Sequence, residues 1–135
     1  MLRRTFLAGL LSACGLSRAS EDQPQSLRGK LVSGPALELG GHQRVSLTSD
    51  DPTLAVLKDA RLAGVDLEVV GRHTAPDRFE VQHIHKRALF VHQRGKRLLI
   101  TYWCDVCYIR TFSPGLCWCC QKYTDLDLRE NLDQP

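Results

Sequence analysis

Apolar and polar residues alternate along the middle of the chain, and such alternation is typical of strands with one buried face. Segments that alternate, or that are rich in β-branched residues, occur at residues 27–32, 43–48, 65–70, 79–84, 88–92 and 97–103. Turn-forming residues separate these segments, and residues 93–96 predict a tight hairpin between the last two. The pattern therefore predicts about six short strands, mostly antiparallel.

One short helix is predicted between the second and third of these segments. Asp50 and Asp51 followed by Pro52 form a helix start, because acidic side chains cap free backbone amides and proline fits the first turn. The apolar face that follows is formed by Leu54, Val56 and Leu57. We expect the helix to end by Gly64, and we interpret the two aspartates as capping residues rather than as a carboxylate pair for acid–base catalysis.

The order of the predicted elements resembles an OB-type barrel. A small closed or partly closed barrel buries short strands efficiently and removes exposed strand edges. The resemblance is topological and implies a fold alone, because one fold can carry many functions. We therefore expect a mainly β protein: a small antiparallel OB-like barrel with one short helix at residues 27–103, with a cysteine-rich hairpin extension at residues 104–135 packed on it.

The N-terminus has the organisation of a secretory signal. Arg3 and Arg4 precede a short apolar run that ends in small residues. This run is far shorter than the roughly 20 residues that span a bilayer. The paired arginines resemble the start of a twin-arginine export signal. Residues 11–14, Leu-Ser-Ala-Cys, resemble a bacterial lipobox, which implies cleavage before Cys14 and lipidation of its thiol.

Export divides the chain into a signal peptide at residues 1–13, a flexible polar tether at residues 14–26 and the folded domain. The alternative is ordinary signal-peptidase cleavage after Ala19, which would leave Cys14 in the discarded piece. With lipidation, we expect a location in the periplasm or at the cell surface, and a membrane contact through the lipidated N-terminus.

The charge of the chain argues against a nucleic-acid partner. The chain has 18 Lys+Arg and 15 Asp+Glu. Loss of Arg3 and Arg4 with the signal leaves 16 basic against 15 acidic residues, a net charge of +1. Nucleic-acid binding depends on a strongly positive surface. We therefore expect an envelope protein or a small ligand as the partner.

Five of the six cysteines lie within residues 104–120, and this cluster is the main chemical signal of the sequence. Thiols this close together ligate a metal, form disulfides or carry redox chemistry. The spacing forms two Cys-x-x-Cys pairs separated by nine residues, with Cys119 in excess; the pairs are Cys104 with Cys107 and Cys117 with Cys120.

Three kinds of chemistry fit the four paired cysteines. They meet the demand of a tetrahedral structural zinc site, with Cys119 as a possible substitute for Cys120, and this is the favoured interpretation. Tyr108 and Gln121 stand where glycine often follows the second ligand of such a pair. An iron–sulfur centre is the second possibility. Disulfides are the third, because thiols oxidise outside the cytoplasm.

Redox catalysis is a further alternative for the same residues. The run Trp103-Cys104-Asp105-Val106-Cys107 after an apolar strand is similar to a thioredoxin-type active site. Only 28 residues follow it, too few to complete that fold, although thiol–disulfide exchange on another scaffold stays possible. Six of the nine aromatic residues lie in the same region, where they could shield a metal centre from water or cover a disulfide-stapled loop.

The sequence gives weaker support for other candidate sites. His83 and His85 fall on one side of a predicted strand and could bind a transition metal together with His92, but exposed strand histidines beside basic residues explain them better. We therefore expect a non-enzymatic envelope binding or accessory protein with a zinc site formed by four cysteines. The alternatives are a redox protein and a disulfide-stapled structural module.

Overall fold

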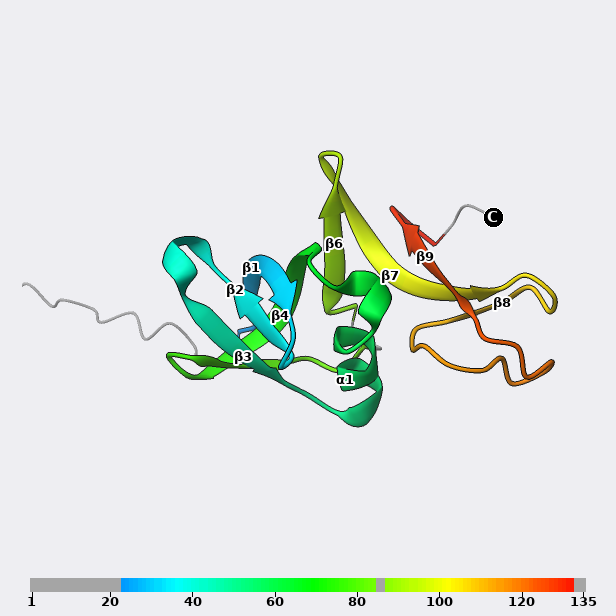
Figure 1. The fold of residues 1–135 in the computed structure, drawn as a ribbon, viewed down its shortest axis with the longest axis horizontal. Coiled ribbons are helices and arrows are strands. Elements are labelled where there is room, and N and C mark those ends of the chain that lie inside the picture. Colours follow the sequence, from blue (N-terminus) through cyan, green and yellow to red (C-terminus); the bar gives the residue numbers. More distant parts are fainter. Residues whose placement is uncertain (1–22, 85–86, 133–135) are drawn as a thin grey trace, which may run out of the picture.

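A computed structural model describes residues 23–84 and 87–132 (Figure 1). The predicted signal peptide, Cys14, most of the tether and His85 lie outside these residues. The strands are β1 (Gln25–Val32), β2 (Ala36–Glu38), β3 (Arg44–Thr48), β4 (Asp66–Ala75), β5 (Arg78–Val81), β6 (Leu89–Gln93), β7 (Lys96–Cys104), β8 (Ile109–Thr111) and β9 (Asp125–Arg129). Helix α1 spans Asp51–Leu57, and short 3-10 turns occur at Gly40–His42 and Ala60–Leu62.

Five strands close into a ring in the order β1-β2-β3-β5-β4, and β4 pairs back to β1. The β3–β5 pair is parallel and the other pairs of the ring are antiparallel. Helix α1 lies between β3 and β4 in the chain. The prediction of a mainly β protein with a small OB-like barrel and one short helix is confirmed.

The alternating pattern explains the core of the barrel. In β3, Val45 and Leu47 point inward and their neighbours are exposed. Helix α1 adds Val56 and Leu57 to the same core. Its predicted start is also confirmed: Asp50 is the N-cap, and its carboxylate accepts a hydrogen bond from the backbone N–H of Thr53 at 3.2 Å.

Strand β4 is longer than its partner β5 and therefore pairs with two strands along one edge. Residues 71–75 of β4 pair with β5, and residues 67–69 pair with β6, while β1 occupies the other edge. The closed ring thus ends with β5 at Val81. The predicted barrel range of residues 27–103 divides into this ring and a β6–β7 hairpin that extends the sheet outside it (Figure 1).

The β6–β7 hairpin has the predicted tight turn. Gln93 pairs with Lys96, so the loop contains only Arg94 and Gly95. Both loop residues have positive φ, 54° and 73°, as a type I′ turn requires.

Strand β7 carries the chain from the barrel to the C-terminal region. Its first residues pair with β6, its last three pair with β8, and β9 pairs along its opposite edge (Figure 1). The segment from the last residue of β7 onward, residues 104–124, is here called the cysteine lobe. None of the helices in the described part of the chain has the length and apolar character needed to cross a bilayer.

Candidate metal centre

The structure brings four of the predicted ligand residues together. The Sγ atoms of Cys104, Cys107, Cys117 and Cys120 all lie within 4.8 Å of one another. Among them, the sulfurs of Cys104 and Cys120 are 3.5 Å apart. Cys104 is the last residue of β7, so one ligand position is held by a regular strand.

The first Cys-x-x-Cys segment folds into a tight turn around the sulfur of Cys104. The backbone N–H of Tyr108 donates to the carbonyl of Cys104 at 2.9 Å. The backbone N–H of Cys107 donates to Cys104 Sγ at 3.4 Å. Tyr108 has a φ of 55°, in the left-handed region that favours glycine.

The second segment repeats this arrangement. The backbone N–H of Gln121 donates to the carbonyl of Cys117 at 3.0 Å, and Gln121 has a φ of 63°. A hydrogen bond from the N–H of Cys117 to the carbonyl of Lys122, at 2.7 Å, closes the base of the turn. Tyr108 and Gln121 depart from the usual pattern of such pairs because they place non-glycine residues at backbone positions that favour glycine. The two turns are hereafter called knuckles.

Hydrogen bonds and crowding set the acidity of the thiols. The backbone N–H groups of Cys120 and Cys119 donate to Cys117 Sγ and lower the pKa of this thiol to about 7. The pKa of Cys107 is raised, because its thiol is hydrogen-bonded to that of Cys119 and because burial and the neighbouring thiols oppose a further negative charge. A bound cation would remove this repulsion, since metal ligation takes cysteine as thiolate.

The sulfur geometry fits one tetrahedral metal ion. Zn–S bonds of about 2.3 Å in tetrahedral geometry place the sulfurs about 3.8 Å apart. The observed sulfurs lie close to this spacing, whereas a disulfide needs about 2.05 Å. The five described cysteines are free thiols. Cys104 and Cys117 are buried and Cys107 and Cys120 half-buried, so the four could hold a metal ion partly shielded from water.

Cys119 stands apart from the four. It is exposed and lies outside the group of converging sulfurs. Cys119 and Cys120 are adjacent residues of the second turn, and only one of them points its sulfur into the cluster. In the structure Cys120 is the one that joins the cluster, and Cys119 does not replace it.

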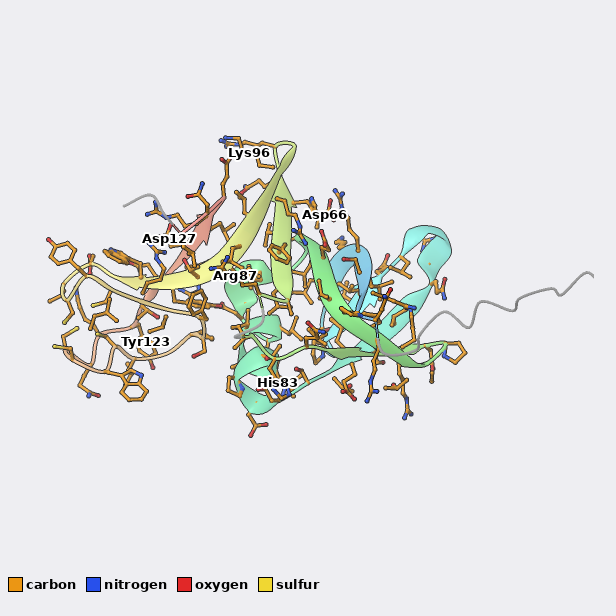
Figure 2. The ribbon with its side chains drawn as sticks, turned by 180° about the vertical axis from the view of Figure 1, so that it is seen from behind. Asp66, His83, Arg87, Lys96, Tyr123 and Asp127 are labelled. Carbon is orange, nitrogen blue, oxygen red and sulfur yellow. The ribbon has the colours of Figure 1, made fainter. Side chains whose placement is uncertain are left out.

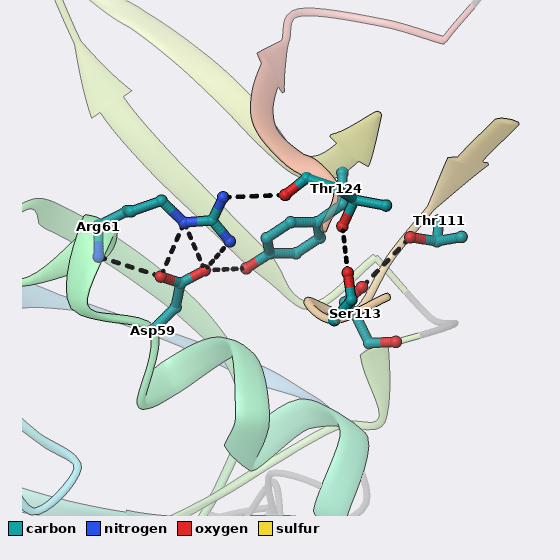
Figure 3. Close-up of polar contacts among 7 residues, drawn as sticks. Asp59, Arg61, Thr111, Ser113 and Thr124 are labelled. Atoms are coloured by element: carbon teal, nitrogen blue, oxygen red, sulfur yellow. Dashed lines mark hydrogen bonds and ion pairs between the residues drawn. The ribbon is translucent and has the colours of Figure 1, made fainter. Parts of the chain in front are cut away.

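A polar network fixes the lobe on the barrel (Figure 3). Tyr102, fully buried in β7, donates its hydroxyl hydrogen to Asp59 Oδ2 at 3.0 Å. Arg61 pairs with the same carboxylate at 2.8 Å and donates to the carbonyl of Thr124 at 3.1 Å. Thr124 in turn donates from its hydroxyl to the carbonyl of Gly115, next to the second knuckle. Burial and the nearby Asp59 raise the pKa of Tyr102, so its hydroxyl stays a donor.

A second network lies on the other side of β7. Arg110 of β8 donates to Thr101 Oγ1 at 2.6 Å and to Asp127 Oδ2 at 2.8 Å, and its guanidinium stacks over the ring of Trp103. These contacts join β7, β8 and β9 directly behind the first knuckle. The sequence showed no sign of either network, because each joins residues far apart in the chain.

The aromatic residues do not form the predicted shield. Tyr102 is buried, but Tyr108, Trp118 and Tyr123 are 75%, 90% and 80% exposed. Two of them, Tyr108 and Trp118, directly follow a ligand cysteine. Because the sulfurs of a knuckle point inward, the adjacent side chains point outward. The prediction that these three aromatics cover the centre is therefore wrong.

The histidines do not form a metal site in the described part of the chain. His92 Nε2 is 2.7 Å from Glu68 Oε1, within the sheet. His83 is largely exposed beside helix α1, with Nδ1 3.8 Å from Asp50 Oδ2 (Figure 2). Asp50 is engaged in capping, as predicted. The only converging group of three or more metal-binding side chains among residues 23–84 and 87–132 is the four-cysteine cluster.

The architecture of the barrel does not identify a function by itself. A closed five-strand ring with one helix is a small OB-like barrel, a scaffold that unrelated functions share. The chain has no significant match among protein-family models, curated proteins or solved structures.

Proposed function

We propose that this is an exported, lipid-anchored cell-envelope protein whose barrel carries a C-terminal lobe built on a zinc centre with four cysteine ligands. Its role is non-enzymatic: it is a binding or accessory module for an envelope protein or a small ligand. The observation that carries the metal centre is the convergence of four sulfurs within 4.8 Å on two equivalent knuckles. Four thiolates fill the coordination of zinc and leave no open position for a reaction, which is typical of structural sites.

The composition of the lobe supports a structural metal. Within residues 104–124 the buried residues are Cys104, Cys117 and Thr124, so the lobe has almost no apolar core of its own. Small units of this kind depend on cross-links or metals for stability. A structural zinc ion contributes on the order of 10 kcal/mol to folding.

Metal analysis and an absorption spectrum of the natively expressed full chain test the centre. One zinc ion per chain without visible colour supports the proposal. Charge-transfer bands in the visible range indicate iron instead. If no metal copurifies and only one thiol titrates, the cysteines form disulfides and the metal centre is refuted.

A matched pair of cysteine variants makes the test specific. Cys117→Ser removes a buried ligand and is expected to abolish stoichiometric metal binding. Cys119→Ser removes a thiol that lies two residues away and outside the cluster, and should leave binding intact. Equal loss of metal in both variants would contradict the assignment of the four ligands.

The export route has its own test. Cys14→Ser prevents lipidation and is expected to move the exported protein from the membrane fraction to the soluble fraction. Replacement of Arg3 and Arg4 by lysine is expected to block export if the twin-arginine route is used. A protein that stays membrane-bound after Cys14→Ser is held there by something other than the lipid.

A redox role is the second candidate, and the exposed Cys119 favours it. Cys119 is exposed and Cys107 is half-buried, so both thiols are accessible to oxidation to a mutual disulfide by the disulfide of an external partner. That reaction would transfer two electrons and two protons to the partner's disulfide and would break the four-cysteine set. Reduction of a model disulfide by the native chain, lost in Cys119→Ser, would support this role over the structural one.

A further inference from the structure

A cavity of about 400 Å³ lies between the end of strand β1 and the end of helix α1. One wall is the turn from β1 to β2, residues 31–35, and the other is the segment from the last residue of α1 onward, residues 57–63. Leu31, Pro35 and Leu57 are buried apolar residues of the lining, whereas Ala60 and Ala63 have side chains too small to fill the space. A mainly apolar cavity of this size is typical of small-molecule sites.

Backbone hydrogen bonds fix both walls of the cavity. The N–H of Leu31 donates to the carbonyl of Val65 at 3.0 Å, and the N–H of Gly64 donates to the carbonyl of Leu31 at 2.9 Å. At the other end of the turn, the N–H of Leu47 donates to the carbonyl of Pro35 at 3.0 Å. The cavity is therefore preformed, so a ligand would bind without the entropic cost of ordering the turn.

The cavity offers one positive charge that has no partner in the described structure. Lys58 is an exposed residue of the lining, and its ammonium group makes no ion pair or hydrogen bond with residues 23–84 and 87–132. Asp59, the other charged residue of the lining, is already neutralised. Its carboxylate pairs with Arg61 at 2.8 Å and accepts a hydrogen bond from the hydroxyl of Tyr102 at 3.0 Å (Figure 3). The charge left for a ligand is thus positive, which favours an anion over a cation.

A smaller apolar cavity, of about 270 Å³, lacks this feature. It lies beside the 3-10 turn at Ala60–Leu62, β6 and β9. Each charged or titratable residue of its lining already has a partner within the chain. The pairs are Arg61 with Asp59, Asp66 with Arg28, and His92 with Glu68. The cavity between β1 and α1 is therefore the better site for a charged ligand.

We propose that the cavity between β1 and α1 binds a small amphipathic anion, whose apolar body lies between the two walls and whose carboxylate pairs with Lys58. A lysine ammonium group sits on a flexible four-carbon stem, so it can reach a carboxylate at the mouth of the cavity.

The volume sets the size of this ligand. At the roughly 30 Å³ that a water molecule occupies in the liquid, the cavity holds about a dozen non-hydrogen atoms, as in a straight-chain carboxylate of about ten carbons. The assignment specifies the small ligand of the proposed binding role and rests on that role. It needs neither the metal centre nor the lipid anchor.

Titration of the full chain with decanoate, followed in a two-dimensional amide spectrum, tests the site. The chain carries Cys14→Ser, which prevents lipidation and avoids detergent, since a detergent is itself an amphipathic competitor. We expect the amide signals of residues 31–34 and 57–63 to shift, with a dissociation constant below about 1 mM. Octanoate, shorter by two methylene groups, should bind about 10-fold more weakly. The absence of saturable shifts at these residues overturns the site.

A charge variant tests the role of Lys58. Lys58→Met keeps most of the apolar stem and removes the charge, so it should weaken decanoate binding about 10-fold and leave the binding of uncharged decanol unchanged. Arg78→Met removes an exposed cation of β5 outside the lining and should leave both ligands unaffected. If Lys58→Met changes neither ligand, or weakens both equally, the pairing of Lys58 with the carboxylate is refuted.

A pair of alanine variants tests the cavity itself. Ala60→Phe places a large side chain on the lining and should abolish the binding of decanoate and of decanol. Ala55→Phe, on the exposed side of α1 and outside the lining, is the matched control and should leave binding intact. The amide spectrum shows at the same time whether each variant keeps the native fold. Unchanged binding in a folded Ala60→Phe variant would overturn the location of the site.

The outcomes separate the ligand site from the metal centre. A chain that carries one zinc ion but shows no decanoate-dependent shifts overturns the ligand site and leaves the metal centre standing. A chain without metal that binds decanoate with the expected shifts refutes the metal centre and supports the ligand site.

Discussion

At the scale of single residues, the fold depends on positions where a side chain has no room. Gly71 lies in β4 where the strand changes partner from β6 to β5, and it pairs with both Gln25 and Val81. A Cβ at this position would collide with the backbone carbonyl of Glu80 and crowd the ring of Phe79. Backbone atoms cannot move aside without opening the ring of strands.

Gly71→Ala is therefore expected to lower the free energy of unfolding by about 2 kcal/mol or more. Urea denaturation of the native chain and the variant measures the difference. Gly40→Ala is the control, because a Cβ there meets nothing within 4 Å, and its change should stay within about 0.5 kcal/mol. Equal effects at both positions would show that close approach to Glu80 is not the cause.

The knuckles contain non-glycine residues in the left-handed backbone region, and a substitution there is predicted to stabilise the protein. Gln121 is exposed and has a φ of 63°, a conformation that costs non-glycine residues about 1 kcal/mol. Gln121→Gly should raise the free energy of unfolding of the metal-loaded chain by about 0.5–1 kcal/mol, whereas Gln121→Ala should not. Chemical denaturation of all three chains distinguishes them. A gain with alanine as well would assign the effect to the lost side chain instead of the backbone.

At the scale of elements, the sheet is joined across its strands by one partly buried carboxylate. Glu68 of β4 accepts hydrogen bonds from Arg97 of β7 at 2.7 Å and from Ser26 of β1 at 2.9 Å. His92 of β6 lies 2.7 Å from the same side chain. Four strands thus meet at a group whose exposed fraction is only 12%.

These contacts predict a defined pH dependence. The hydrogen bond from Arg97, followed by those with His92 and Ser26, lowers the pKa of Glu68 to about 2 despite its burial. Because the folded-state pKa lies below the ordinary value of 4.5, the stabilisation is complete above pH 4.5 and is lost as the pH falls toward 2. Its size is on the order of 3 kcal/mol.

Glu68→Gln should remove this component. The difference in unfolding free energy between the native chain and the variant should be largest near neutral pH and shrink steadily below pH 4.5. Denaturation curves at a series of pH values measure it, and the comparison cancels acid effects common to both chains. A difference that stays constant with pH would mean that Glu68 does not titrate as described.

The elements that the sequence predicts are those with a strong local pattern. Alternation identified the longer strands, and the acidic residues before Pro52 identified α1. Strands β2, β8 and β9 were not predicted. β2 and β8 have three residues each, and β9 (Asp-Leu-Asp-Leu-Arg) forms because β7 offers it a partner. Pairing with a distant strand is a tertiary effect that local propensity does not contain.

For the metal centre too, the local sequence pattern predicts one part and the tertiary contacts determine the rest. Spacing alone identified the four cysteines, because two Cys-x-x-Cys pairs match the number of ligands that zinc takes. The spacing could not exclude Cys119 as a ligand. It also could not reveal the network of Asp59, Arg61 and Tyr102 that holds the lobe on the barrel. Those contacts depend on how the chain folds back on itself.

At the scale of the whole molecule, the barrel and the cysteine lobe differ in how much apolar core stabilises them. The continuous apolar core lies within the barrel and the β6–β7 hairpin. The cysteine lobe contributes to this core only through its neighbouring strand β9, by the partly buried Leu126 and Leu128. The barrel therefore has its own source of stability, and the lobe would depend on the metal ion that we propose for it.

Chelation is accordingly expected to unfold the lobe and spare the barrel. In a two-dimensional amide spectrum, signals of the cysteine lobe should collapse toward random-coil positions while those of β1–β5 stay dispersed. Thermal unfolding of the barrel should shift little. Loss of dispersion throughout the spectrum would mean that the two parts fold as a single unit.

The pairing of β7 has a consequence for aggregation. Ring closure leaves β1–β5 without free edges, but β7 is protected at its outer end only by β8 and β9. These two strands pair with residues 99–104 of β7. Most of that segment belongs to the run Leu-Leu-Ile-Thr-Tyr-Trp at residues 98–103, which is apolar, uncharged and rich in strand-forming residues, as fibril-forming segments are. Metal loss would uncover this edge, so the demetallated chain should bind thioflavin T on incubation and the metal-loaded chain should not. The metal ion would then protect the protein from fibril formation as well as shape its lobe.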